Sequence, residues 1–272
     1  MAPERLDPVI ALSSGLTRVC VSGTGPPLIW THGFLNSVDV EEQLGLSELL
    51  LGLSGTRLVR YDARGHGRSE AGRDEAASAW SSLGADLLEL VALLGLERPV
   101  AGGASMGVAT TLHAAVRAPD RFAGMILLIP PTAWETRKAQ ADLYRGGAAL
   151  VETRGVAGYL EAVRVSFRAN PLPGFTPEML ETLLDGMRAK SALELARLLR
   201  GAAASDLPEP ERIRALEIPA LVIATRDDPG HPLSTAERLV ELLPNAELVV
   251  LRDLREAATA RDTLLRFLAR AS

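Results

Sequence analysis

The stretch Val100-Ala101-Gly102-Gly103-Ala104-Ser105-Met106-Gly107 decides the fold, because it places a serine between an apolar strand and a helix. The residues up to Gly102 are typical of a buried strand, and the pattern after Met106 is helical. A serine on so sharp a turn takes a strained backbone conformation that presents its Oγ outward. Small flanking residues let the neighbouring chain pass close to this turn. We therefore predict that Ser105 is a nucleophile.

A second motif, Trp30-Thr31-His32-Gly33-Phe34, ends an earlier apolar strand. Its glycine lets the chain turn over the edge of the sheet, so backbone N–H groups can point inward. We expect the N–H of Phe34 and the N–H of Met106 to form an oxyanion hole beside Ser105. A simple strand-ending turn is the alternative. His32 is expected to brace this turn by hydrogen bonds, with a direct catalytic role as the secondary possibility.

Short apolar runs alternate with helical patterns along the chain. The runs typical of buried strands are 27–31, 57–61, 99–102, 124–129, 220–224 and 247–251. The helical patterns between and after them are 40–53, 76–94, 106–116, 234–243 and 257–269. This alternation predicts an α/β fold with a mostly parallel, doubly wound sheet and helices on both faces.

The segment from Trp134 to about Ser205 breaks the alternation, because its pattern is helical throughout and contains no evident strand. We expect one domain over 1–272, with a core of 1–133 and 206–272 and a helical cap of about 134–205. Such a cap would cover the C-terminal edge of the sheet, where open α/β folds bind their ligands. The alternative is that these helices only enlarge the core. Arginines of this segment, Arg137 among them, are expected on its solvated face.

Composition and charge exclude several classes of partner. The net charge of -5, with no stripe of Lys and Arg, argues against nucleic acid. No apolar run is long enough to span a bilayer, so a membrane partner is not expected. Cys20 is the single cysteine and allows no intramolecular disulfide, which is compatible with a reducing compartment such as the cytoplasm. No pattern indicates a metal or an organic cofactor, and the sequence does not indicate an oligomeric state.

A third motif, Tyr61-Asp62-Ala63-Arg64-Gly65-His66-Gly67-Arg68-Ser69, follows the next strand. With the His-Gly turn and the serine turn in the same order and spacing, the chain resembles the α/β-hydrolase superfamily over nearly its whole length. The resemblance implies a Ser-His-acid triad whose acid follows the strand after the cap. Asp228 matches that position, although Thr225 replaces the usual glycine. Asp227 remains the alternative acid.

The sequence departs from the superfamily at the histidine. A Gly-His pair is expected after the last strand, but this chain has no histidine after position 231. His66 belongs to a structural turn, and His113 lies two turns along the helix from Ser105. His231 follows the acid strand on the side where Ser105 is expected. We therefore hypothesise that the base has moved to His231, with Asp228 or Asp227 orienting it; the alternative is an exposed turn residue.

These residues predict a serine hydrolase acting on a small or medium ester, thioester or lactone through an acyl-enzyme on Ser105. The missing late histidine keeps two alternatives open: a ligand-binding protein without chemistry, and a cofactor-free lyase or cyclase. Asp39, Glu41 and Glu42 follow the His-Gly turn at the start of a helix, with Ser37 as a plausible N-cap. Capping is the expected role of these acids; contact with a cationic or hydroxylated substrate is the alternative.

Overall fold

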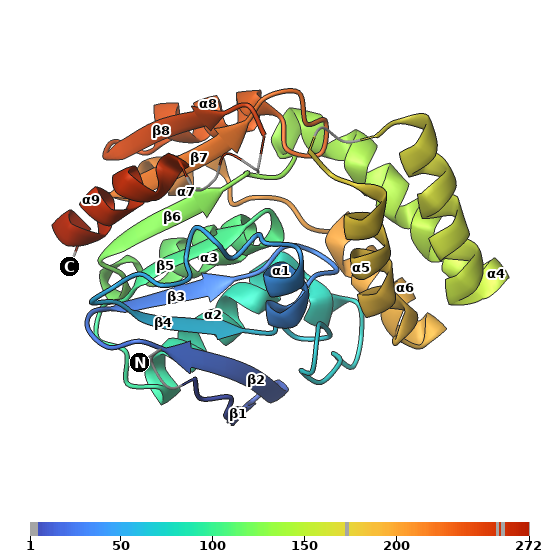
Figure 1. The fold of residues 1–272 in the computed structure, drawn as a ribbon, viewed down its shortest axis with the longest axis horizontal. Helices are drawn as coiled ribbons and strands as arrows, with labels where there is room; N and C mark the ends of the chain where they lie inside the picture. Colours follow the sequence, from blue (N-terminus) through green and yellow to red (C-terminus); the bar gives the residue numbers. More distant parts are fainter. Residues whose placement is uncertain (1–4, 172–173, 254–255, 257–258, 272) are drawn as a thin grey trace.

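The buried strands pair into one sheet in the computed structural model, which describes residues 5–171, 174–253, 256 and 259–271. Within these residues the sheet has eight strands in the order β1-β2-β4-β3-β5-β6-β7-β8 (Figure 1). β1 and β2 pair antiparallel, β2 pairs antiparallel with β4, and the strands from β3 to β8 are parallel to their neighbours. The strands are β1 (Val9–Leu12), β2 (Gly15–Ser22), β3 (Pro27–Thr31), β4 (Arg57–Tyr61), β5 (Val100–Ala104), β6 (Gly124–Leu128), β7 (Ala220–Thr225) and β8 (Ala246–Leu251).

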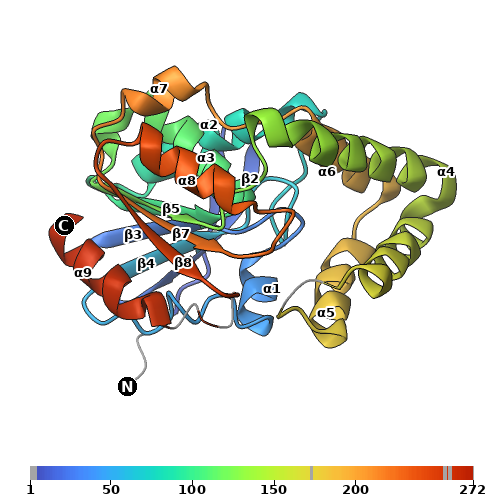
Figure 2. The same cartoon turned by 90° about the horizontal axis from the view of Figure 1, so that it is seen from above.

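Nine α-helices lie within the described residues, on both faces and at one end of this sheet. They are α1 (Val38–Gln43), α2 (Trp80–Leu93), α3 (Met106–Arg117), α4 (Arg137–Ala169), α5 (Pro177–Arg188), α6 (Ala192–Ala203), α7 (Pro210–Arg214), α8 (Leu233–Leu242) and α9 (Arg261–Ala271). Figure 2 shows α2, α3, α7 and α8 on one face of the sheet and α1 and α9 on the other. The mostly parallel, doubly wound sheet is therefore confirmed.

Successive side chains of the parallel strands enter two different cores, because neighbouring residues of a strand point to opposite faces. Ile29 and Leu127 pack into the core formed with α2, α3, α7 and α8. Leu28 and Ile126, their neighbours in sequence, pack into the core that contains Phe267 of α9. Burial on both faces explains why these strands are continuous apolar runs.

Three elements differ from the sequence prediction. The helix expected over 40–53 ends at Gln43, because Gly45 and Gly52 take φ angles of 70° and 68° and the chain continues in turns. The helix expected over 76–94 is interrupted at Ala79, whose extended ψ of 142° separates a short 3-10 turn from α2. The antiparallel pair β1 and β2 was not predicted. The expected helix at 257–269 begins partly outside the described residues, and its described part is α9.

The segment between β6 and β7 is helical, as the sequence predicts, and its helices α4, α5 and α6 stand beyond the C-terminal ends of the parallel strands (Figure 1). These helices have their own apolar core, which includes Val151, Leu184 and Leu199. α4 is divided at Gly155, whose φ of 69° and ψ of 179° are not helical. Phe34 and Leu35 of the turn after β3 pack into the same core, so this segment contacts the C-terminal edge of the sheet.

Candidate active site

Ser105 occupies the turn between β5 and α3 in a strained conformation, with φ 52° and ψ −108°. A positive φ is uncommon for a residue with a side chain and costs on the order of 1–3 kcal/mol, which the surrounding structure must offset. One such contact is the hydrogen bond from the Ser105 N–H to the carbonyl of Leu128, at 3.0 Å. The turn is thereby fixed to β6, the neighbouring strand.

Both glycines beside Ser105 are required by close approach to β3. A Cβ on Gly107 would lie 2.1 Å from the carbonyl oxygen of Thr31, and a Cβ on Gly103 would lie 2.6 Å from the same oxygen. No side chain fits at such distances. The packing of β3 against the start of α3 therefore explains why small residues flank the serine.

His231 lies against Ser105, although 126 residues separate them in the sequence. The Nε2 atom of His231 is 2.8 Å from Ser105 Oγ, and its Nδ1 atom is 2.8 Å from Oδ2 of Asp228. An ionised carboxylate only accepts hydrogen bonds, so Nδ1 carries the proton and Nε2 is free to accept from the serine hydroxyl. The three side chains thus form one chain of hydrogen bonds, ordered from acid to imidazole to hydroxyl.

Asp228 is held in place from both sides of its carboxylate. Its Oδ1 accepts the N–H of Gly230 at 2.9 Å, while Oδ2 faces His231. Burial alone would raise the pKa of Asp228, but the hydrogen bond and charge of His231 and the nearby backbone N–H groups lower it below its usual value. Asp227 is exposed, has a φ of 56°, and is not among the hydrogen-bond partners of His231 in the described residues.

The turn after β3 approaches the serine turn closely. A Cβ on Gly33 would lie 3.9 Å from the Cβ of Ser105. In the described parts of the chain, the N–H groups of Phe34 and Met106 donate no hydrogen bond to protein atoms. Buried or half-buried N–H groups are normally paired, so two unpaired donors beside a serine suit a ligand oxygen.

The other histidines serve the framework. His32 is buried, its Nδ1 donates to the carbonyl of Gly33 at 2.7 Å, and its Nε2 accepts from the N–H of Ala63 at 3.0 Å. Burial lowers the pKa of His32, which keeps it neutral with both nitrogens engaged. His66 is buried in the following turn, and burial lowers its pKa as well. His113 lies 2.9 Å from the carbonyl of Asp206, away from Ser105.

A family model described as alpha/beta hydrolase fold matches residues 26–255. The chain belongs to the α/β-hydrolase family. It is 30% identical to 3-oxoadipate enol-lactonase 2 of Acinetobacter baylyi over 71% of this chain and 70% of that protein. It is 28% identical to a non-heme haloperoxidase of Rhodococcus erythropolis, over 84% of each chain. Family membership and the lactonase relative support a hydrolase activity.

Solved structures of other α/β-hydrolases share the fold along almost the whole chain. The enol-lactonase of Burkholderia xenovorans superimposes with a TM-score of 0.77 at 22% identity, covering 96% of this chain and 100% of that one. A thermophilic esterase of Thermogutta terrifontis superimposes with a TM-score of 0.74 at 23% identity, covering 98% and 99%. At these identities the likeness concerns the fold.

The structure corrects the expectation for Arg137 and reveals a role that the sequence did not indicate. Arg137 is only 5% exposed, and its guanidinium stacks 4.1 Å from the ring centre of Trp80. Its Nε donates to the carbonyl of Ser205 at 2.7 Å, and its Nη1 donates to Thr132 Oγ1 at 3.2 Å. Arg137 therefore joins the two ends of the helical segment where they meet the sheet. No feature of its local sequence distinguishes it from the exposed arginines.

Asp39, Glu41 and Glu42 differ from one another in the structure. Asp39 and Glu42 form ion pairs with arginines, Asp39 with Arg68 at 2.9 Å and Glu42 with Arg5 at 2.9 Å. Glu41 is 2% exposed and points toward the turn after β3. The side chain of Ser37 accepts a hydrogen bond at the start of α1, as expected of an N-cap.

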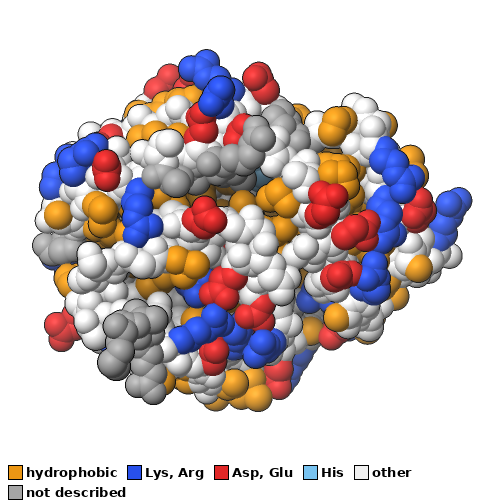
Figure 3. Space-filling model, viewed as in Figure 1, with side chains coloured by type: hydrophobic (Ala, Val, Ile, Leu, Met, Phe, Trp, Pro, Cys, Tyr) orange, Lys and Arg blue, Asp and Glu red, His pale blue; other side chains and the backbone are white. Residues whose placement is uncertain are grey.

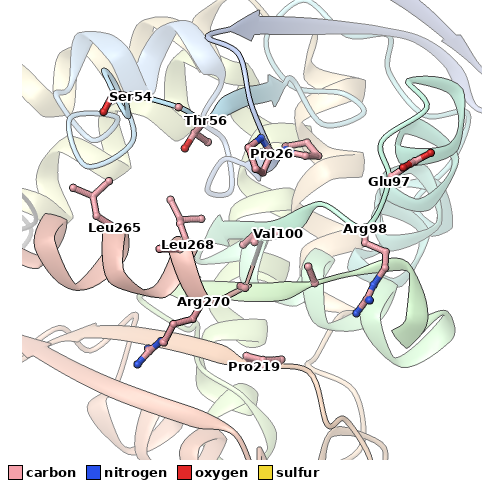
Figure 4. A pocket seen from close by; sticks show the side chains of 15 residues that line it. Pro26, Ser54, Thr56, Glu97, Arg98, Val100, Pro219, Leu265, Leu268 and Arg270 are labelled. Atoms are coloured by element: carbon pink, nitrogen blue, oxygen red, sulfur yellow. The ribbon is translucent and has the colours of Figure 1, made fainter.

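The hydrolase has a cavity at the opposite edge of the sheet from Ser105. This pocket of about 860 Å³ is lined near the starts of the parallel strands by Thr56, Val100 and Pro219 and by Leu268 of α9 (Figure 4). Ligands of open α/β sheets bind at the C-terminal ends of the strands, so this pocket is not part of the site described above. Figure 3 shows Lys and Arg beside Asp and Glu on the face of Figure 1, without a large patch of one sign.

Within the described residues, no group of three or more His, Cys, Asp and Glu side chains is arranged to hold a metal ion. In the same residues, no helix combines the length and the apolar character needed to cross a membrane.

Proposed function

We propose that this hydrolase cleaves small or medium carboxylic esters, thioesters or lactones through an acyl-enzyme on Ser105, with His231 as the general base. The observation that carries the proposal is the 2.8 Å contact between His231 Nε2 and Ser105 Oγ, together with the 2.8 Å contact between Nδ1 and Asp228. A serine hydroxyl of ordinary pKa is a poor nucleophile, and an adjacent base corrects this. His231 thus takes the place of the histidine missing from the last loop.

Acylation follows from the proton positions. Ser105 Oγ attacks the carbonyl carbon of the substrate while its proton passes to His231 Nε2, and Asp228 stabilises the resulting imidazolium. The carbonyl oxygen becomes an oxyanion that accepts hydrogen bonds from the N–H groups of Phe34 and Met106. As the intermediate collapses, Nε2–H gives its proton to the leaving alcohol, thiol or lactone oxygen, and the acyl group remains on Ser105.

Deacylation repeats these steps with water. His231 Nε2 removes a proton from water, the hydroxide attacks the acyl carbon, and the oxyanion occupies the same two N–H groups. The proton then returns from Nε2 to Ser105 Oγ as the carboxylic acid leaves. One imidazole therefore serves both half-reactions, and neither step needs a metal or a redox cofactor.

The helical segment 134–205 is proposed to act as the cap that encloses the substrate. Phe34, which would supply an oxyanion N–H, packs edge-on against Tyr144 of α4, with ring centres 5.1 Å apart. The core of this segment is apolar and continues to Phe34. An apolar acyl or alcohol group fits these surroundings, and the enol-lactonase relative makes lactones reasonable substrates to include.

The test combines an activity assay with a probe for the nucleophile. Wild type is expected to hydrolyse p-nitrophenyl acetate and butyrate and to be labelled by a fluorophosphonate, whereas Ser105→Ala does neither. An exposed serine such as Ser234 provides the matched control, because Ser234→Ala should leave both results unchanged. A wild type that is inactive and unlabelled contradicts the proposal and favours a ligand-binding protein. Labelling without ester hydrolysis redirects the search to other acyl substrates.

A further inference from the structure

Glu41 is a buried acid that the proposed chemistry does not use. It lies in the first turn of α1, is 2% exposed, and contacts two hydrogen-bond donors. Its Oε1 accepts the backbone N–H of Gly33 at 3.3 Å, and its Oε2 accepts the indole N–H of Trp30 at 3.2 Å. Trp30 lies near the end of β3, and Gly33 lies in the turn that follows this strand. Both carboxylate oxygens therefore hold the segment that ends at Phe34.

We propose that Glu41 is a positioning residue, whose ionised carboxylate fixes the turn at Gly33 so that the Phe34 N–H points at the substrate oxyanion. This inference rests on the proposed function, because it concerns the oxyanion hole of that same site. Glu41 touches neither the reacting atoms nor Ser105. Its effect passes through the backbone of Gly33, which directly precedes Phe34. By holding the Gly33 N–H, Glu41 fixes the orientation of the chain that leads to the Phe34 N–H.

The two donors match an ionised carboxylate better than a neutral one. An ionised carboxylate offers lone pairs on both oxygens, so it accepts from Gly33 and Trp30 together. Protonation turns one oxygen into a hydroxyl that needs an acceptor of its own, and the donor facing it loses a strong partner. The turn is then held by one good hydrogen bond in place of two.

Burial, together with the surrounding donors and charges, places the ionisation of Glu41 near neutrality. Burial is the largest influence and raises the pKa of Glu41 to about 7, although the Gly33 N–H, the Trp30 N–H and the charge of Arg60 oppose it. Asp62, which follows β4, adds to the rise through like-charge repulsion. Arg60 on β4 is itself paired with Glu42, so it acts on Glu41 only at longer range. On α1 the remaining acid, Asp39, is paired with Arg68.

The main test compares Glu41→Gln with wild type in p-nitrophenyl butyrate hydrolysis across the acid range. Glutamine keeps the acceptor for Gly33 but presents an amide N–H₂ group to the Trp30 N–H, and it does not ionise. We expect kcat to fall by about tenfold with little change in KM, because an oxyanion donor acts in the transition state. We also expect a shallower acid limb of kcat/KM, since the protonation of Glu41 no longer contributes to it.

Glu48→Gln is the matched control, because Glu48 is an exposed carboxyl shortly after α1. It should leave both kcat and the acid limb unchanged. Identical acid limbs in wild type and Glu41→Gln, or a fall in kcat equal to that of Glu48→Gln, overturn the positioning role. A wild type that neither hydrolyses the ester nor is labelled by a fluorophosphonate overturns the proposed function itself, and the two failures are thereby distinguished.

A stability measurement tests the ionisation without using catalysis. Because the folded pKa of Glu41 is raised from 4.5 to about 7, its contribution to stability is fully present below pH 4.5 and is lost as the pH rises through 7. Glu41→Gln lacks this loss. Its urea midpoint should therefore rise relative to wild type between about pH 5 and about pH 8. A constant difference between the two proteins over that range overturns the claim that the fold raises the pKa of Glu41.

Discussion

Replacing Asp228 with asparagine should disable His231 without moving it. Asp228 Oδ1 accepts the Gly230 N–H at 2.9 Å, and an asparagine side chain can keep this bond with its carbonyl oxygen. Its amide N–H₂ group then faces His231 Nδ1, where the carboxylate oxygen lies 2.8 Å away in wild type. A donor at this place requires Nδ1 to be an acceptor, so the ring proton moves to Nε2. That nitrogen points at Ser105 Oγ and can no longer accept its proton.

The expected loss in kcat for Asp228→Asn is about 10⁴-fold, on the order of 5 kcal/mol, as for the wrong tautomer in other serine triads. The assay is p-nitrophenyl butyrate hydrolysis at saturating substrate, with circular dichroism to show that the fold is retained. Asp227→Asn is the matched control, because Asp227 is the exposed neighbour and is not among the hydrogen-bond partners of the His231 side chain in the described residues; it should keep nearly full activity. A loss below about tenfold for Asp228→Asn, or equal losses in both variants, refutes the tautomer argument.

Three further predictions concern packing, the helical segment and acid stability. Gly107→Ala should destabilise the protein by about 3 kcal/mol or more in urea unfolding, because its Cβ would meet the Thr31 carbonyl at 2.1 Å. Gly146→Ala, which has open space around it in α4, should instead raise the free energy of unfolding by about 0.5–1 kcal/mol. Arg137→Met should cost about 2–3 kcal/mol by leaving the acceptors on Ser205 and Thr132 without their donor, and an unchanged unfolding midpoint would contradict this. The fold lowers the pKa of Asp228, so its ionisation stabilises the protein above about pH 4, and this contribution is lost on further acidification. The stability of Asp228→Asn should therefore fall less steeply than that of wild type below that pH. Equal slopes of stability against pH in the two proteins would count against the hydrogen bond to His231.

The sequence predicts the parallel part of the sheet well, because both faces of these strands are buried and their apolar runs stand out from the turns. The start of α3 and the residues around Ser105 could be predicted equally well, because close contacts with β3 require glycines there. β1 and β2 were missed because they form an antiparallel pair at the edge, where Val9 and Leu16 are exposed and no continuous apolar run forms. The helix expected after the His-Gly turn was too long, because glycines in the left-handed region end it early.

The site was predictable to the extent that topology decides it. Residues that follow parallel strands gather at one edge of the sheet, so the loop after β7 was expected near the loop after β5. The contact of His231 with Ser105, and the choice of Asp228 over Asp227 as its partner, depend on side-chain directions that no sequence pattern fixes. The burial of Arg137 and Glu41 was missed for the same reason: a charged residue in an amphipathic helix is normally solvated, and only tertiary packing encloses it.

The most direct test of the displaced base is kcat/KM for His231→Ala on p-nitrophenyl butyrate, measured with and without added imidazole. His113→Ala serves as the control, because His113 is a partly buried histidine bonded to the Asp206 carbonyl and remote from the serine. The displaced-base account predicts a loss of about 10⁴-fold or more for His231→Ala, partial recovery with imidazole, and near wild-type activity for His113→Ala. If His231→Ala keeps full kcat/KM on an ester that Ser105→Ala does not hydrolyse, His231 is not the base.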